Sequence, residues 1–227
     1  MKKLILLTAI FFAGNLIKAQ ETFFPTKVGT VLIYKTFDKK DKLLGTAKYT
    51  IKDVTASGSD IDITYQYESF DPKDKLLFKE DITVHQKGDV MYMDMSNFVN
   101  KAAFQQNGEI PSELAIKGNN LEIPLNPKPG DKLADANVEM SMKMGFVSMK
   151  MSTDLTNRKV DDIENISVKG GTYKCYKFSC DFSSVAMGIK ANGKNISWYA
   201  KGIGTVKSES YDKNGSLQSR MELVEVK

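Results

Sequence analysis

The chain has 227 residues, of which 41% are hydrophobic and 26% are charged, and it contains two cysteines and one histidine. This length and composition are typical of a globular protein with a substantial core, and they exclude a largely disordered chain and a multi-span membrane protein. The single histidine, His85, excludes any site that needs two imidazoles from one chain, such as most zinc hydrolases and the two-histidine iron oxygenases. We therefore expect a soluble domain and no metal centre.

Residues 1–19 have the three regions of a secretory signal peptide. Two lysines give a positive start, residues 4–13 form an apolar run, and Ala19 is a small residue at the expected cleavage point. The apolar run is too short for a bilayer span, which takes about 20 residues, and no cysteine stands where a bacterial lipoprotein is lipidated. The sequence predicts a single exported domain over residues 20–227, periplasmic or secreted, with no transmembrane anchor.

Removal of the signal peptide would lower the formal net charge from +4 to +1, because three lysines leave with it. The remaining chain has no clustered stripe of lysine and arginine. Binding to nucleic acid or to anionic lipid by counterion release therefore has little driving force. We expect no nucleic-acid partner.

Alternation of apolar and polar residues with a period of two dominates the chain. In residues 60–68, isoleucines and tyrosines alternate with polar residues, as in a strand with one buried and one solvated face. Similar patterns predict strands at residues 31–37, 46–54, 76–85, 89–95, 136–144, 147–155, 173–182, 196–200, 204–211 and 217–226. One short helix is predicted from Ser96 to Gln106, with Ser96 as its cap. The predicted fold class is all-β, mostly antiparallel, a curved sheet or open barrel with one short helix.

Three segments of similar composition predict hairpin tips: residues 37–43, 70–76 and 211–217. Each has an aromatic residue, an aspartate, a polar tip and a leucine, and the aspartate can accept a hydrogen bond from the backbone two residues further on. Calcium binding by these loops is disfavoured because lysines outnumber the spare carboxylates. The proline-rich stretch from residue 110 to 135 is predicted to be a long surface connection between two groups of strands.

Cys175 and Cys180 are separated by five positions in a predicted strand. This odd spacing places them on opposite faces, roughly 16 Å apart at about 3.3 Å per residue. A disulfide needs Cα atoms within about 7 Å of each other. We expect two free thiols.

Five methionines flank a potential hairpin turn at residues 145–146, and they are Met140, Met142, Met144, Met149 and Met151. The register set by this turn pairs Met140 with Met151 and Met142 with Met149, so that all five thioethers share one face. This face could pack in the core, line an adaptable apolar cavity, or offer sulfur ligands to Cu(I). Since no histidine or cysteine lies near it in the sequence, we assign it no metal and take the five methionines as candidate ligand-binding residues.

No motif of a catalytic or cofactor site is present: the sequence lacks Gly-x-Ser-x-Gly, a phosphate-binding glycine loop and a dinucleotide fingerprint. His85 precedes a predicted hairpin tip, where an ordinary surface histidine is expected. The sequence therefore predicts no catalytic residues, no cofactor and no enzymatic activity.

Three motifs carry a resemblance to a known family: Asn-Pro-Lys-Pro-Gly-Asp-Lys-Leu from Asn126, Trp-Tyr-Ala-Lys-Gly-Ile-Gly-Thr-Val-Lys from Trp198, and Asp-Lys-Asn-Gly from Asp212. With them the chain resembles the TapB-like family of exported bacterial proteins of unknown function, from Pro25 to the C-terminus. The resemblance implies one antiparallel β fold, similar to the open barrels of periplasmic lipoprotein carriers, with a short helix against the concave side. It implies no catalytic residues.

The predicted function is binding of an apolar ligand, such as a lipid, an acyl chain or a hydrophobic peptide, on the concave face of the sheet next to the methionines. The alternative is a non-enzymatic structural or protein-interaction module of the cell envelope, which engages a protein partner through an exposed sheet edge or apolar patch. A pocket inside the sheet favours the first function, and an apolar patch on the outside favours the second.

Overall fold

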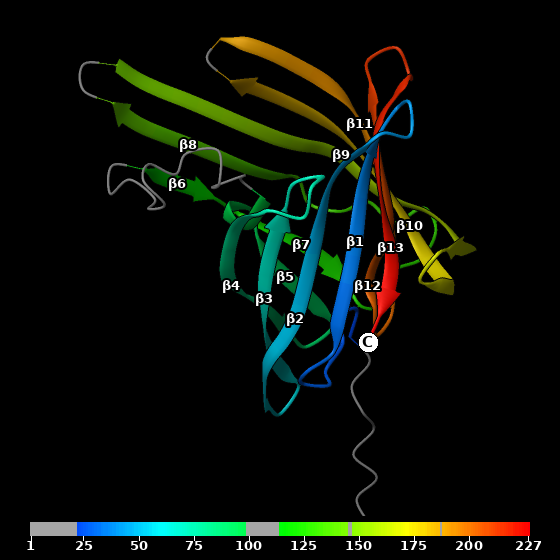
Figure 1. Cartoon of the computed structure of the whole chain (residues 1–227). Coiled ribbons are helices and arrows are strands. Elements are labelled where there is room, and N and C mark those ends of the chain that lie inside the picture. The colour runs from blue at the N-terminus through cyan, green and yellow to red at the C-terminus, as the bar shows by residue number, and fades with distance from the viewer. Residues whose placement is uncertain (1–21, 99–113, 145–146, 187) are drawn as a thin grey trace, which may run out of the picture.

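The computed structural model describes residues 22–98, 114–144, 147–186 and 188–227, in which thirteen strands form one antiparallel sheet (Figure 1). The strands are β1 (Val31–Asp38), β2 (Leu43–Ser57), β3 (Asp60–Phe70), β4 (Leu76–Lys87), β5 (Val90–Asp94), β6 (Ala115–Gly118), β7 (Asn120–Pro124), β8 (Ala136–Met144), β9 (Val147–Val168), β10 (Gly171–Ala186), β11 (Ile189–Ala200), β12 (Gly204–Asp212) and β13 (Leu217–Val226). Their order across the sheet is β6-β8-β9-β10-β11-β12-β13-β1-β2-β3-β4-β5-β7. The predicted all-β antiparallel fold is therefore confirmed.

The two edges of the sheet meet, so that the sheet is nearly closed into a barrel. β6 pairs with β8 and β7 pairs with β5, yet only Asn119 separates β6 from β7 in the chain. The Asn119 N–H donates to the Asn137 carbonyl and the Asn119 carbonyl accepts from the Met95 N–H, each at 3.2 Å. Gly118 allows this change of partner, because a Cβ atom there would lie 2.7 Å from the Asn137 carbonyl oxygen.

Near the point where β6 and β7 meet, one arginine side chain connects β7 to the segment before β8. Arg158 on β9 is buried, and its guanidinium donates to the carbonyl of Ala134 and, at 2.9 Å, to the carbonyl of Glu122 on β7. The donors of a guanidinium form a planar fork, which lets one side chain bind two carbonyl groups at once. Arg158 thus links the free edge of β7 to the other side of the barrel.

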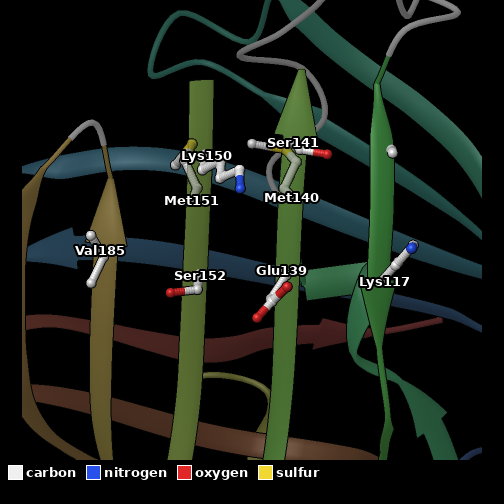
Figure 2. A pocket seen from close by; sticks show the side chains of 9 residues that line it. Lys117, Glu139, Met140, Ser141, Lys150, Met151, Ser152 and Val185 are labelled. Atoms are coloured by element: carbon white, nitrogen blue, oxygen red, sulfur yellow. The ribbon is translucent and has the colours of Figure 1, made fainter. Parts of the chain in front are cut away.

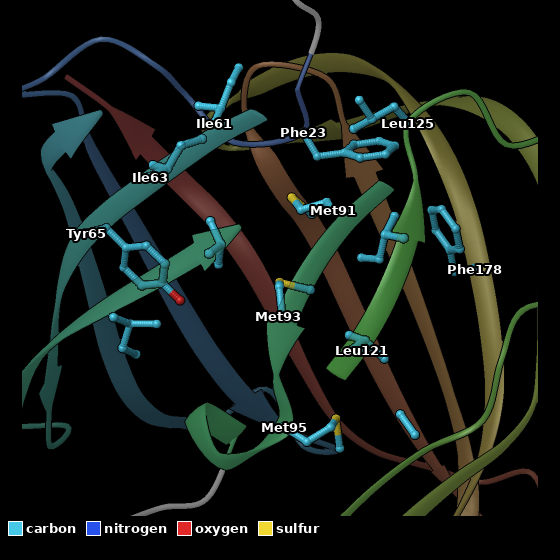
Figure 3. Packing of buried hydrophobic residues seen from close by; sticks show 14 of the residues in the cluster. Phe23, Ile61, Ile63, Tyr65, Met91, Met93, Met95, Leu121, Leu125 and Phe178 are labelled. Carbon is cyan, nitrogen blue, oxygen red and sulfur yellow. The ribbon is translucent and has the colours of Figure 1, made fainter. Parts of the chain in front are cut away.

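One half of the barrel is filled by a hydrophobic core. Met91, Met93 and Met95 follow one another along the inner face of β5 and its end, and Phe23 and Leu125 lie at one end of this core (Figure 3). Phe23 comes from the segment before β1 and makes edge contacts with three aromatic rings at centroid distances of 5.5–6.3 Å: Tyr176, Phe178 and Tyr199. The N-terminal segment therefore plugs this end of the barrel.

A smaller core lies on the outer face, where the turn between β9 and β10 folds back over β13. The Gly170 N–H in this turn donates to the Leu223 carbonyl at 3.1 Å. Trp198 is buried here with Cys175, its indole N–H donates to Glu164 at 2.8 Å, and two lysines lie over its ring. The predicted burial of Trp198 is confirmed. Both cysteines are free, as predicted.

The three predicted hairpin tips share one hydrogen-bonding pattern. In each, an aspartate Oδ1 accepts from the backbone N–H groups two and four residues further on, at 2.8–2.9 Å: Asp38, Asp71 and Asp212. The residue three positions after each aspartate has a positive φ, and it is Asp41, Asp74 or Gly215. The prediction of three tips of similar build is confirmed.

Three sequence predictions about secondary structure need correction. The stretch from residue 110 to 135, predicted as a surface connection, contains β6 and β7. The strand predicted at residues 147–155 continues to Val168. The sequence pattern did not predict this continuation, because a bulge at Asn157, which has a positive φ of 51°, interrupts the alternation with a period of two. The predicted helix begins as a 3-10 turn, Met95–Phe98, with Asp94 rather than Ser96 capping it, and the rest of its range lies outside the described residues.

Candidate ligand-binding cavity

The barrel contains a cavity of about 810 Å³ beside its filled core, and this cavity is open to solvent. The cavity lies against the inner faces of β2 and β8 to β13, next to the 3-10 turn. Figure 1 shows that the β8–β9 and β10–β11 hairpins extend well beyond the neighbouring strands at this end, so the sheet opens outward there. A volume of this size is within the range of about 300–1,000 Å³ typical of small-molecule sites.

One wall of the cavity is mainly apolar and comes from the 3-10 turn, β8 and β9. Its apolar side chains are Met95, Val138, Met140, Met151 and Leu155, and Ser152 and Thr153 of β9 are its polar members. The β8–β9 hairpin carries all but Met95, because Met140 pairs with Met151 and Ala136 pairs with Leu155, so residues at every second position point the same way. Three thioethers make this wall easy to reshape.

The opposite wall is polar and comes from β11 and β12. The Asn195 amide donates to Ser208 at 3.4 Å and to Ser210 at 3.1 Å. Ser197 donates to the Asn195 carbonyl oxygen at 2.8 Å and also lies 3.0 Å from the Ser208 hydroxyl. These four neutral side chains form a connected strip along the cavity, which we call the Asn–Ser strip.

Titratable groups in the cavity stay neutral at ordinary pH. Burial raises the pKa of the Tyr49 and Tyr199 phenols and of the Cys180 thiol. Among the residues that the structure describes, none that lines the cavity is an acid or base that is charged at neutral pH. The site therefore offers van der Waals surface and neutral hydrogen-bonding groups to a ligand.

The predicted register of the methionine hairpin is confirmed: Met140 pairs with Met151 and Met142 with Met149. Met140 and Met151 line the cavity, whereas Met142 is buried and is not among the lining residues. The side chains of Met144 and Met149 lie outside the described part of the structure.

The other face of the same hairpin is polar. A smaller pocket of about 320 Å³ there is lined by Lys117, Glu139, Ser141, Lys150 and Ser152, and also by Met140 and Met151. Figure 2 shows Lys117, Glu139 and Ser152 on neighbouring strands beside the paired Met140 and Met151. The hairpin is thus amphipathic.

The Asn–Ser strip was missed at the level of sequence. Asn195 and Ser197 alternate with Ile196 and Trp198, and this pattern predicts that the apolar pair faces the core and the polar pair faces water. In the structure the β9–β10 turn covers the apolar pair from outside, so the polar pair faces the inside of the barrel. The alternation itself was a correct signal, but it does not identify which face is internal.

His85 lies away from the cavity. Its Nδ1 is 2.7 Å from the Asp62 Oδ1 on β3, and both side chains are about half exposed. In the described ranges, no three or more His, Cys, Asp or Glu side chains gather closely enough to hold a metal ion. The same ranges contain no helix long and apolar enough to cross a membrane.

Comparison with known proteins gives a family and a fold. Residues 27–223 match the sequence profile of a family described as DUF3108-like. No curated protein matches the chain. The TapB-like resemblance stays a prediction.

Two solved structures share the architecture. One, from Bacteroides fragilis, is described as an inferred exported protein with a YmcC-like fold; it has a TM-score of 0.77 and 19% identity, and the match covers 91% of this chain and 99% of that one. The other, an inferred lipoprotein from Parabacteroides distasonis, has a TM-score of 0.76 and 24% identity over the same shares of the two chains. At these identities the likeness shows the fold alone.

Proposed function

Because this chain belongs to the DUF3108-like family, a name that gives no activity, we propose a function from the cavity: the protein binds an apolar ligand inside the barrel. The observation that carries this proposal is the cavity of about 810 Å³ with Met95, Met140 and Met151 in its wall. Apolar side chains that face this open space are less well buried than side chains in a packed core, so they contribute less to the stability of the fold. A lipid, an acyl chain or a hydrophobic peptide fits its size and chemistry.

Binding rather than catalysis is proposed because the part of the cavity wall that the structure describes holds no charged group to act as a general acid or base. The thiol that lines it, Cys180, has a raised pKa and so is a poor nucleophile at neutral pH. His85, paired with Asp62, belongs to the outer surface.

We place this function in the periplasm or outside the cell. The support is the predicted signal peptide in residues 1–19 and the descriptions of the two structural relatives as an exported protein and a lipoprotein. No cysteine precedes Cys175 in this sequence, so lipidation at the predicted cleavage point is not part of the proposal.

The proposal is tested with residues 20–227 purified from a bacterial periplasm. Native mass spectrometry followed by solvent extraction identifies any co-purified lipid. The uncharged fluorescent probe N-phenyl-1-naphthylamine is then titrated into delipidated protein, and one saturable site per chain is expected.

A matched pair of variants links binding to the cavity. Met151→Trp places an indole in the cavity and should weaken probe binding at least tenfold, whereas Lys150→Trp places it on the exposed outer face and should leave binding unchanged. Equal effects of the two substitutions, or no saturable binding by the parent protein, would refute the proposal.

An interaction module of the cell envelope is the second candidate. It is favoured by large apolar side chains at the hairpin tips, where Leu76 and Leu77 are 47% and 46% exposed and Ile189 is 72% exposed. For this function, Leu77→Ser should abolish the capture of an envelope protein without changing probe binding. If the substitution does not change the capture of the envelope protein, the exposed leucines at this hairpin tip are not the interaction surface.

A further inference from the structure

The cavity has two chemically different sides, and this difference restricts its ligand further than apolarity alone. Methionine and aliphatic side chains predominate on one side, on the 3-10 turn, β8 and β9, where Ser152 and Thr153 are the polar members, and the Asn–Ser strip of β11 and β12 forms the other side. A purely hydrocarbon ligand would displace water from the strip and leave the acceptor sites that are not used within it, and the Ser210 hydroxyl hydrogen, without a partner, which is unfavourable for buried polar groups. The strip therefore favours a ligand with polar groups of its own.

The strip can bind both donors and acceptors. Three hydroxyls and one amide together offer about eight acceptor lone pairs, and the hydrogen bonds within the strip use at most five of them. Ligand hydroxyl groups can donate to the remainder. Ser210 only accepts within the strip, so its own hydrogen can be donated to a ligand carbonyl.

The described lining disfavours a ligand charge deep in the cavity. A carboxylate or ammonium group buried there would meet no counterion among the lining residues that the structure describes, and burial of an unpaired charge is strongly unfavourable. Arg158 interacts electrostatically with two lining residues, Cys180 and Tyr199, but is not itself a lining residue. Its guanidinium donates to the carbonyls of Ala134 and Glu122, and these hydrogen bonds direct it toward the backbone rather than toward a ligand carboxylate.

We propose that the ligand is an uncharged amphiphile of the acylglycerol or acyl ester class, with its acyl chain against the methionine side and its ester and hydroxyl groups on the Asn–Ser strip. This inference rests on the proposed function, because it names the ligand class of the same cavity. It distinguishes an esterified acyl chain from a free fatty acid, which carries a carboxylate at neutral pH.

The test is competition against bound N-phenyl-1-naphthylamine at pH 8, with delipidated residues 20–227. We expect 1-palmitoylglycerol to displace the probe at a concentration at least tenfold lower than palmitate, which has the same chain but a charged head. Displacement by palmitate at an equal or lower concentration would overturn the inference while leaving the proposed function intact. A probe that does not bind at all would refute the proposed function, and this inference with it.

Variants of the strip give a second readout. Asn195→Leu keeps the approximate size of the side chain and removes both polar groups, so it should weaken 1-palmitoylglycerol at least tenfold and change probe affinity less than threefold. Ser210→Ala is a milder substitution at a half-buried position, and it serves as the second variant in case Asn195→Leu does not fold. It should weaken the binding of 1-palmitoylglycerol threefold or more. The control Ser183→Ala, at an exposed position of β10, should change neither. Equal losses for probe and acylglycerol, or no loss in either strip variant, would overturn the inference.

Discussion

The two edges of the sheet, β6 and β7, meet at a junction that we call the seam of the barrel. Replacement of Arg158 by methionine should open this seam and destabilise the protein by about 3 kcal/mol. The Arg158 guanidinium donates to two backbone carbonyls on opposite sides of this seam, at Ala134 and Glu122. An unsatisfied buried carbonyl costs about 1–3 kcal/mol, so losing both donors costs about 2–6 kcal/mol. The neutral methionine recovers part of this, because a buried guanidinium is itself poorly solvated, as the lowered pKa of Arg158 indicates.

The measurement is urea unfolding at 25 °C, with a thermal melt as a check. A loss of about 3 kcal/mol should lower Tm by about 6–12 °C in a domain of this size. The control Lys159→Met alters the next residue, whose side chain is half exposed, and should cost less than about 0.5 kcal/mol. If Arg158→Met costs no more than this control, the guanidinium does not hold the seam and our account of barrel closure is wrong.

Three other predictions concern the core, the sheet and the thiols. Met93→Ala, in the filled core, should lower the free energy of unfolding by about 2–5 kcal/mol. Met151→Ala, at the cavity wall, should lower it by less than about 1 kcal/mol, because the substitution enlarges an existing space. Urea unfolding compares the two variants, and equal losses of stability would contradict the cavity. Gly193→Ala should cost about 1–3 kcal/mol in the same assay, because its Cβ would meet a carbonyl of the paired strand β12; a neutral result would mean that the strands can separate locally. Burial raises the pKa of Cys175 to about 11 and that of Cys180 above its ordinary value. Alkylation of the native protein by iodoacetamide, measured by peptide mass spectrometry, should therefore be slow at pH 8 and faster as the pH rises. Rapid labelling at pH 8 would show that the thiols are more accessible than the fold allows.

Local patterns predicted much of the architecture because each depends on residues close together in the chain. The register that pairs Met140 with Met151 follows from a two-residue turn and the alternation of a strand. The hairpin tips follow from aspartates that hydrogen-bond their own loop, as Asp38 and Asp71 do. Interactions of this kind are specified by neighbours in the sequence, so a single sequence is enough to predict them.

Closure of the barrel depends on contacts that no local pattern encodes. Asn119 changes partner strands inside a segment whose prolines suggest a loop, and its amide binds the Asn137 N–H and the Asp135 carbonyl. Arg158 binds carbonyls 24 and 36 positions away in the chain, and backbone carbonyls carry no side-chain signature that a sequence could show. The position of the seam, and with it the distinction between filled and hollow halves of the barrel, therefore emerges only in three dimensions.

The methionines show how this limit bears on function. Met91, Met93 and Met95 alternate in the sequence in the same way as Met140 and Met142, so periodicity assigns both groups to an inner face without separating them. What separates them is the space that each residue meets. Phe23 and β7 complete the core around Met91 and Met93, whereas Met140 lies next to the cavity, and Met95 belongs to the core and also lines the cavity. The polar residues opposite, from Asn195 to Ser210, are neutral and already bonded to one another, so they can remain inside the barrel at low cost before a ligand arrives. A hollow with one adaptable apolar side and one preformed polar side is therefore a consequence of where the barrel closes, and the ligand class that we infer follows from that closure rather than from any single motif.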